Sequence, residues 1–163
     1  MKLTRRSVLK GAGAGLGTAF AASILPIQSK ADDEIVIASL FDQSGGLDIY
    51  GTPMTMTCEL AVEEINAAGG VRGHQIEAIV EDGASDWPTF AEKARKLIGK
   101  DKVAAVQGCY TSASRKAVLP VFEKMKGLLY YPTYYEGLEI SPNIMYTAQE
   151  ATQSSIAATE WLF

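Results

Sequence analysis

The sequence predicts a doubly wound α/β fold with a parallel sheet, and three observations support this. Short apolar runs of strand length alternate four times with amphipathic stretches of helical length. The connections between them are short, and the apolar runs are continuous, as in strands that are covered on both faces. This order is typical of parallel strands joined by right-handed crossovers. Ligands of such sheets bind outside the carboxyl ends of the strands, so the loops after each strand are where binding residues are expected.

Each element has a local signal. The apolar run 34–41 predicts the first strand, and helical spacing from about residue 52 to 68 ends at Gly69-Gly70, a frequent helix stop. Residues 75–80 predict the second strand. Pro88 opens a helix that runs to about residue 99, since a proline in the first turn leaves no hydrogen bond unmade. The further elements are a strand at 103–107, a helix at 114–126, a strand at 128–131, a candidate strand at 143–147 and a last helix from about residue 152.

The first 31 residues are expected to be an export signal. A basic head without acidic residues precedes an apolar stretch at 11–27, which is short and rich in glycine for a membrane span. Small residues precede an expected cleavage site before Asp32. The pair Arg5-Arg6 resembles the twin-arginine signature, with Val8 where that pattern often has an aromatic residue; an ordinary secretory signal or an uncleaved anchor is the alternative. Residues 32–163 then form one domain, expected in the periplasm.

Charge and cysteine usage exclude several classes of partner. Five of the 15 basic residues lie in the signal, so residues 32–163 keep 10 basic and 19 acidic residues and a formal charge of −9. An acidic chain without a basic stripe argues against nucleic acid as a partner. Cys58, on an apolar helical stripe, and Cys109, after a buried strand, are expected to be separate core thiols. With one histidine they cannot form a structural zinc site of the usual kind, and no metal or other cofactor is expected.

The loop after the third predicted strand, 108–115, is the most informative stretch. Gly108 is expected to let the backbone turn tightly, and Ser112 and Ser114 are both good helix N-cap residues. A helix N-terminus offers N–H groups and a partial positive charge to a carbonyl or carboxylate oxygen. Tyr110 adds an amphipathic wall with one hydroxyl. The alternative is that the serines only cap the helix and Tyr110 only covers the sheet edge.

A second group of candidate binding residues, rich in tyrosine, follows the fourth predicted strand. Five of the seven tyrosines lie between Tyr110 and Tyr135, on strand ends expected to be adjacent. Tyrosines at such a cleft can enclose a small ligand and still provide hydrogen bonds. An aromatic patch covered by another layer of protein is the alternative, and both can hold together.

Catalytic motifs are weak. His74 follows Gly73 in a predicted turn, far along the chain from every candidate nucleophile, and a general base must be held within reach of its nucleophile. No G-x-S-x-G elbow surrounds Ser44, Ser112 or Ser114. We therefore do not expect an enzyme.

The motifs resemble those of type I periplasmic binding proteins, the class that includes branched-chain amino acid receptors. The first are N-A-A-G-G-V-R-G at 66–73 and the pair Ser44-Gly45 after the first strand. The segments G-C-Y-T-S-A-S-R-K-A-V-L-P-V-F at 108–122 and Y-P-T-Y-Y-E-G-L-E at 131–139 are more closely similar to the branch that binds urea and short-chain amides. The likeness runs from about residue 35 to the end of the chain.

This resemblance implies a ligand held between two lobes. It carries the ligand-contacting role over to Tyr110 and Ser112 in the first segment and to Tyr131 and Thr133 in the second, with Ser44 and Gly45 as further candidates. Tyr134 is the seventh candidate, and its ring would make the cleft smaller. It departs from the pattern, since amide sensors have proline there and urea receptors differ at both Thr133 and Tyr134. A neutral amide can be satisfied by hydroxyl and backbone groups, whereas an amino acid needs a buried carboxylate for its ammonium. Glu136 is the nearest carboxylate and is expected to be structural.

The functional expectation is a substrate-binding component of an ABC transporter that delivers urea or a short-chain aliphatic amide to a membrane permease. Residues 32–163 would be its N-terminal lobe, incomplete and without the second lobe. The alternatives are a branched-chain amino acid receptor and an amide sensor that regulates an amidase operon. Because such sensors are cytoplasmic, residues 1–31 discriminate between the receptor and the sensor.

Overall fold

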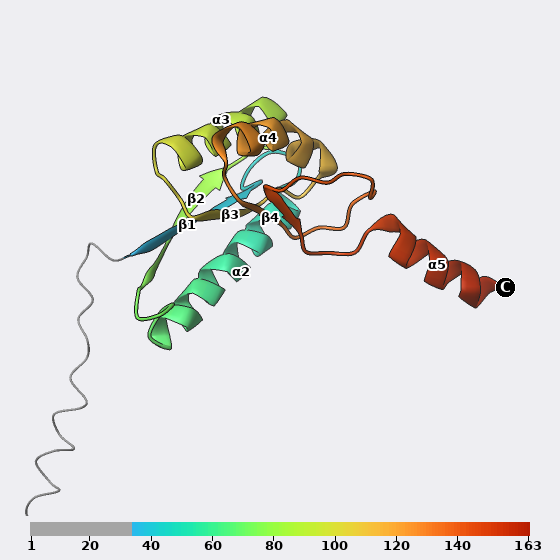
Figure 1. Ribbon diagram of the computed structural model, residues 1–163, viewed down its shortest axis with the longest axis horizontal. Coiled ribbons are helices and arrows are strands. Elements are labelled where there is room, and N and C mark those ends of the chain that lie inside the picture. Colours follow the sequence, from blue (N-terminus) through green and yellow to red (C-terminus); the bar gives the residue numbers. More distant parts are fainter. Residues whose placement is uncertain (1–33) are drawn as a thin grey trace, which may run out of the picture. The chain divides into compact units, whose positions relative to one another are not determined.

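The computed structural model describes residues 34–163, and its sheet has the predicted doubly wound α/β architecture (Figure 1). The signal predicted at 1–31 lies outside the described residues. All five strands are parallel, in the order β2-β1-β3-β4-β5. The elements are β1 (Ile35–Phe41), α2 (Asp48–Ala67), β2 (Ile76–Asp82), α3 (Trp87–Gly99), β3 (Ala105–Gly108), α4 (Ser112–Met125), β4 (Leu129–Tyr131), β5 (Ile144–Tyr146) and α5 (Ala151–Leu162).

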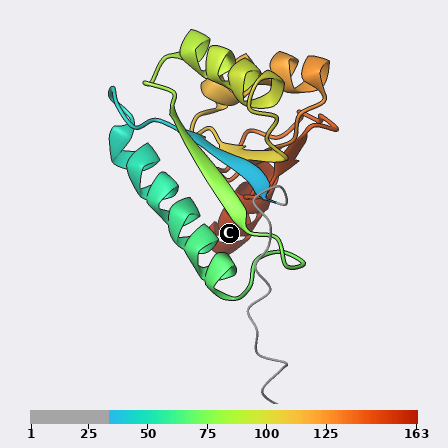
Figure 2. The same ribbon diagram turned by 90° about the vertical axis from the view of Figure 1, so that its left-hand side faces the viewer.

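The helices cover the two faces of the sheet unequally. Figure 2 shows α2 along one face and the pair α3 and α4 along the other. Contacts on both faces agree with this arrangement: the hydroxyl of Ser39 in β1 donates to Thr55 of α2 at 3.3 Å, and Glu81 in β2 pairs with Lys93 of α3 at 2.7 Å. Successive residues of a strand point to opposite faces, so each strand supplies one row to each side.

The packed core lies between the sheet and the pair α3 and α4. Its fully enclosed members are Leu40, Phe90, Ala94, Leu97, Val106, Cys109, Val118, Phe122, Leu129 and Tyr131. Leu119 and Ile98 are only partly buried and pack against this cluster. The α2 face is more open, and Cys58, Val62 and Ile65 of α2 line an open hollow there with β1 and β2.

The strand order places the topological switch point between β1 and β3. From β1 the chain runs through α2 to β2 on one side, then crosses through α3 to β3 on the other. The loops after β1 and β3 therefore diverge and leave a crevice at the carboxyl edge, which is where ligands bind in open α/β sheets. The register pairs Ser39 with Gln107 and Gln107 with Tyr130, so β1, β3 and β4 end close together.

The start of α2 and the turn after β3 differ from the sequence-based expectation. Helix α2 begins at Asp48, four residues earlier than expected, because the Leu47 carbonyl accepts N–H bonds from both Tyr50 and Gly51. Gly108 was expected to let the backbone turn tightly, but the left-handed backbone conformation after β3 falls on Cys109, with φ of 66°. Gly108 is needed for a different reason: a Cβ there would lie 2.6 Å from the carbonyl oxygen of Leu40.

Cys58 and Cys109 are both free, as expected, but only Cys109 lies in the core, since Cys58 is partly buried. Burial raises the pKa of the Cys109 thiol to about 12, so this group is neutral at physiological pH and behaves as a small core residue.

We predict that Phe90→Ala lowers the free energy of unfolding of the chain by about 3–5 kcal/mol, because it leaves a cavity in the core between α3 and the sheet. Phe90 is 0% exposed, and a Cβ on Gly83 would lie 2.2 Å from its ring. Urea unfolding followed by circular dichroism measures the change. Met56→Ala, at a position that is 62% exposed on α2, is the control and should be nearly neutral. Equal losses in both variants would contradict this description of the core.

Candidate ligand-binding site

Five of the seven predicted site residues surround one cavity at the carboxyl ends of β3 and β4. The cavity holds about 210 Å³, and it is lined by Tyr110, Thr111, Ser112, Tyr131, Thr133, Tyr134 and Glu136. Its walls come from the loop between β3 and α4 and from the segment that follows β4. This is the edge that the alternation of strands and helices indicated, and the parallel register of β3 and β4 brings the two segments together.

The first wall is the N-terminus of α4. Thr111 is the N-cap, and its side chain accepts from the N–H of Ser114 at 3.0 Å. This corrects the expectation that Ser112 or Ser114 caps the helix: Thr111 has the extended backbone that a cap requires, whereas Ser112 is already the first helical residue. The N–H groups of Ser112 and Ala113 lie in the first turn of α4, where no preceding helical turn supplies carbonyl partners.

The second wall is the segment after β4. Tyr131 is buried, and its hydroxyl donates to the carbonyl of Tyr110 at 3.1 Å and, more weakly, to that of Tyr134 at 3.5 Å. Burial raises the pKa of the Tyr131 hydroxyl, so it stays protonated at neutral pH. The side chain of Tyr134 is 68% exposed.

Thr133 has the one hydroxyl of this cavity that is both buried and unpaired. Its Oγ1 is out of contact with solvent and has no hydrogen-bond partner among the described residues. A buried hydroxyl without a partner costs free energy, and such a group calls for an explanation. A ligand that donates to it or accepts from it would supply the missing bond.

Ser44 and Gly45 do not line this cavity. The Ser44 hydroxyl donates to Asp82 at 2.6 Å, and Gly45, with φ of 84°, lies against Ser85 so closely that a Cβ would be 2.6 Å from its hydroxyl. These contacts tie the loop after β1 to the loop after β2. A ligand-contacting role for Ser44 and Gly45 stays a prediction.

Sequence reasoning missed two contributors to the site. Tyr50, in the first turn of α2, stacks on the Tyr110 ring with centroids 4.5 Å apart and extends the aromatic wall. Tyr50 was missed because the helix was expected to begin only at about residue 52. Arg115, one turn into α4, is fully buried, and its role follows from tertiary contacts that no local pattern reveals.

Arg115 connects α4 to the segment between β4 and β5. Its Nε donates to Glu139 at 2.8 Å, its Nη1 to the Ser112 hydroxyl at 3.0 Å and its Nη2 to Glu136 at 3.4 Å. The guanidinium also lies over three aromatic rings, with centroid distances of 4.7 Å to Tyr131, 5.4 Å to Tyr135 and 5.7 Å to Tyr146. Glu136, expected to be structural, is held here and also borders the cavity.

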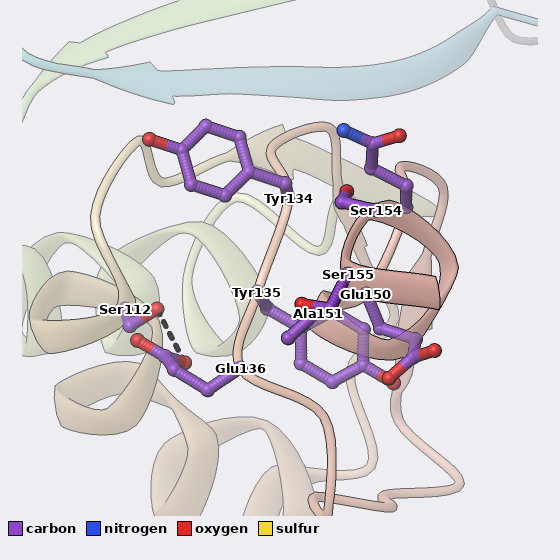
Figure 3. Close-up of a pocket in the computed structure, with 9 residues that line it drawn as sticks. Ser112, Tyr134, Tyr135, Glu136, Glu150, Ala151, Ser154 and Ser155 are labelled. Atoms are coloured by element: carbon purple, nitrogen blue, oxygen red, sulfur yellow. Dashed lines mark hydrogen bonds between the residues drawn. The ribbon is translucent and has the colours of Figure 1, made fainter. Parts of the chain in front are cut away.

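A second hollow adjoins this cavity, and Figure 3 shows its lining. It holds about 410 Å³ and reaches from Ser112 and Glu136 to the N-terminus of α5, where Glu150 forms a capping box with Gln153. In the close-up, Ser112 and Glu136 face one another on one side, and Ser154 and Ser155 of α5 lie on the other.

His74 lies in the turn between α2 and β2, at the amino end of the strands and so at the edge opposite the cavity. Within residues 34–163, no cluster of three or more His, Cys, Asp or Glu side chains could hold a metal ion. In the same range, no helix has the length and apolar character that crossing a membrane requires.

The fold and the position of the cavity define the class of protein. The sequence matches the family model "Periplasmic binding protein domain" over residues 35–163. The chain therefore belongs to the periplasmic binding protein domain family, and its sheet is that of a lobe of a type I periplasmic binding protein.

Individual relatives narrow the comparison. The chain is 34% identical to "Leu/Ile/Val-binding protein homolog 8" of Brucella abortus over 132 residues. The match covers 80% of this chain and 30% of that protein. The chain superimposes with a TM-score of 0.69 and 34% identity on the branched-chain amino acid transporter substrate binding protein LivJ of Streptococcus pneumoniae in complex with isoleucine, over 72% of this chain and 34% of that one. The chain also superimposes on a fatty acid ABC transporter substrate-binding protein of Thermomonospora curvata with a TM-score of 0.69 and 26% identity, over 82% of this chain and 34% of that one. The chain thus spans about a third of the length of these relatives.

We predict that the ion pair of Glu139 makes folding sensitive to acid. Burial opposes ionisation of Glu139, but bonds from Arg115 and Tyr146 outweigh it and lower its pKa. A group with a depressed pKa stabilises the fold above its unfolded pKa, and this contribution is lost as pH falls through the folded value. The wild type should therefore lose stability below about pH 4, where free glutamate titrates.

Thermal unfolding of wild type and Glu139→Gln from pH 7 to pH 3 measures this effect. The variant should be less stable at pH 7 and should show a flatter dependence on pH. Glu92→Gln, on the exposed side of α3, is the control and should follow the wild-type curve. If Glu139→Gln also followed that curve, Glu139 would contribute nothing to the fold.

Proposed function

We propose that this chain is part of the solute-binding component of an ABC transporter, and that its cavity binds one side of a small ligand with amino acid character. Membership of the periplasmic binding protein family supports the first statement, together with relatives described as Leu/Ile/Val-binding homologues and as transporter binding proteins. The observation that carries the second is the cavity itself: hydroxyl groups and a helix N-terminus meet at the carboxyl edge of a doubly wound sheet.

The lining suits a branched-chain amino acid in three respects. The first-turn N–H groups of α4 offer a site for its carboxylate. Glu136, with the adjacent Ser112 hydroxyl, offers acceptors for its ammonium group. Apolar surface for its side chain is offered by the rings of Tyr110, which stacks on Tyr50, and of Tyr134. The relatives favour this ligand over the urea or short amide that the sequence resemblance implies.

A short-chain amide or urea is the second candidate, and the charge of the lining is the observation that favours it. The cavity has no cationic residue in its lining, and the carboxylate of Glu136 is already paired with Arg115 at 3.4 Å. An uncharged ligand would be satisfied by hydroxyl and backbone groups alone. In both cases the role is binding for delivery to a membrane permease, without catalysis. Export to the periplasm rests on the signal proposed at residues 1–31.

We predict that a ligand of the correct class raises the melting temperature of the chain, because it binds only the folded state. The gain in folding free energy is about 2.7 kcal/mol at a ligand concentration one hundred times the Kd. Thermal shift with L-leucine, L-isoleucine, acetamide and urea in parallel identifies the class. A shift with acetamide or urea alone would move the ligand to neutral amides, and no shift with any of the four would contradict the proposal.

Matched variants connect the shift to the cavity. Thr133→Val removes the unpaired hydroxyl with little change of volume and should weaken binding about 3- to 10-fold, the loss of one hydrogen bond. Thr52→Val, on the exposed side of α2, is the control and should bind as wild type does. Equal affinity in the Thr133 variant and the control would place the ligand elsewhere.

A further inference from the structure

The carboxyl of Asp42, which directly follows β1, is enclosed but only half satisfied. Asp42 is 0% exposed. Its Oδ1 accepts the N–H of Ser85 at 2.9 Å, whereas its Oδ2 is buried and has no hydrogen-bond partner among residues 34–163. The first turn of α2 closes the site, because a Cβ on Gly51 would overlap the carbonyl oxygen of Asp42. An ionised carboxylate has only acceptors, so a charge on Asp42 would leave one of its oxygens without any donor.

The neighbouring carboxylate, Asp82 at the end of β2, has the opposite environment. Its Oδ1 accepts N–H groups from Gln43 at 2.8 Å, Ser44 at 3.2 Å and Ala84 at 2.7 Å. Its Oδ2 accepts the hydroxyl of Ser44 at 2.6 Å. Burial opposes ionisation of Asp82, but these bonds outweigh it and lower its pKa, so this carboxyl is charged at neutral pH. Of two neighbouring carboxyls, one is therefore surrounded by donors and the other is not.

The surroundings of Asp42 disfavour its charged form. Burial is the main reason why the pKa of Asp42 is raised above its ordinary value; the charge of Asp82 adds to this, and bonds from Ser85 are outweighed. The Cys109 thiol, which follows β3, also faces Asp42 and stays neutral, since burial raises its pKa to about 12. On the side of α3, the Asp86 carboxylate caps its own helix. Within residues 34–163, no lysine or arginine forms an ion pair with Asp42.

Ser85 belongs to a turn whose backbone needs such bonds to persist. Ala84 and Ser85 have left-handed φ angles of 51° and 53°, which residues with a Cβ rarely adopt. The Ser85 N–H is held in this turn by Asp42. The Ser85 hydroxyl accepts the N–H of Leu47 at 3.1 Å and donates to the Ser44 carbonyl at 3.0 Å. Asp42 therefore holds a strained turn that joins the loop after β2 to the start of α2.

We propose that Asp42 is a pH-sensitive switch for the contact between the loops after β1 and β2. While its carboxyl carries a proton, the turn at residues 84–85 stays closed over it. When the carboxyl is ionised, the enclosed charge favours opening of the turn, because water then supplies the missing donors to Oδ2. The sign follows from linkage. A carboxyl whose pKa is raised in the closed state stabilises that state below its free value, about 3.9 for aspartate, and this contribution is lost as pH rises through the raised value.

Amide hydrogen exchange measures the switch at the bond itself. NMR follows the N–H groups of Ser85 and Leu47 in the full chain between pH 4 and pH 8, after correction for the intrinsic pH dependence of exchange. This range lies above the acid loss expected from Glu139. In wild type, the protection of both groups should fall as pH rises through the titration of Asp42, by up to about tenfold per pH unit. Asp42→Asn stays neutral and keeps Oδ1 as an acceptor, so its protection should not fall and should exceed that of wild type at pH 8.

Asp86→Asn is the matched control, because it removes an exposed carboxylate of the same loop and leaves a residue that can still cap α3. This variant should keep the wild-type fall in protection, and equal profiles in Asp42→Asn and wild type would overturn the proposal. A carbon-detected NMR titration of the Asp42 carboxyl in wild type needs no variant. Its midpoint should lie above about 3.9, and a midpoint at or below this value would also overturn the proposal.

Discussion

The site depends on the hydrogen bonds and ion pairs of the buried Arg115 guanidinium. β4 and β5 are parallel neighbours, yet the segment 132–143 between them contains no helix to pack it against the sheet. Arg115 holds that segment to α4 through Glu136 and Glu139. A buried charge is tolerated only when its hydrogen bonds are satisfied, and the surrounding aromatic rings add to this. Arg115 thereby helps to hold the two walls of the cavity together.

Sheet topology provides the second constraint. Because β1 lies between β2 and β3, the loops that follow β1 and β3 leave the sheet in different directions. The loop after β1 is bound to the loop after β2 through Asp82 and Ser85. It leads into the first turn of α2, where Tyr50 reaches the Tyr110 ring. Aromatic side chains from two loops on either side of the switch point thus form one wall.

Local sequence signals were sufficient for the architecture. Apolar runs of strand length, helical spacing and glycine or proline at the boundaries predicted every described element to within a few residues. The parallel register then follows from short crossovers, and it brought Tyr110, Ser112, Tyr131 and Thr133 to one cavity as expected. These predictions succeeded because they depend on periodicity and on the order of elements.

The details that failed depend on tertiary contacts. Gly108 was assigned a turn, but its constraint is the approach of the Leu40 carbonyl from another strand. Thr111 rather than a serine caps α4, since the backbone conformation of each loop residue decides the cap. No local pattern indicated a role for Arg115, and only its partners, 21 to 24 residues away along the chain, show why it is buried. Such pairs leave no periodic trace in a single sequence.

The central claim is that the hydroxyl-lined cavity between α4 and the segment after β4 receives a small ligand. A crystal structure of the protein with its ligand tests this most directly. The account predicts ligand density against Ser112 and Thr133. Ligand bound instead in the apolar hollow between α2 and the sheet would contradict it.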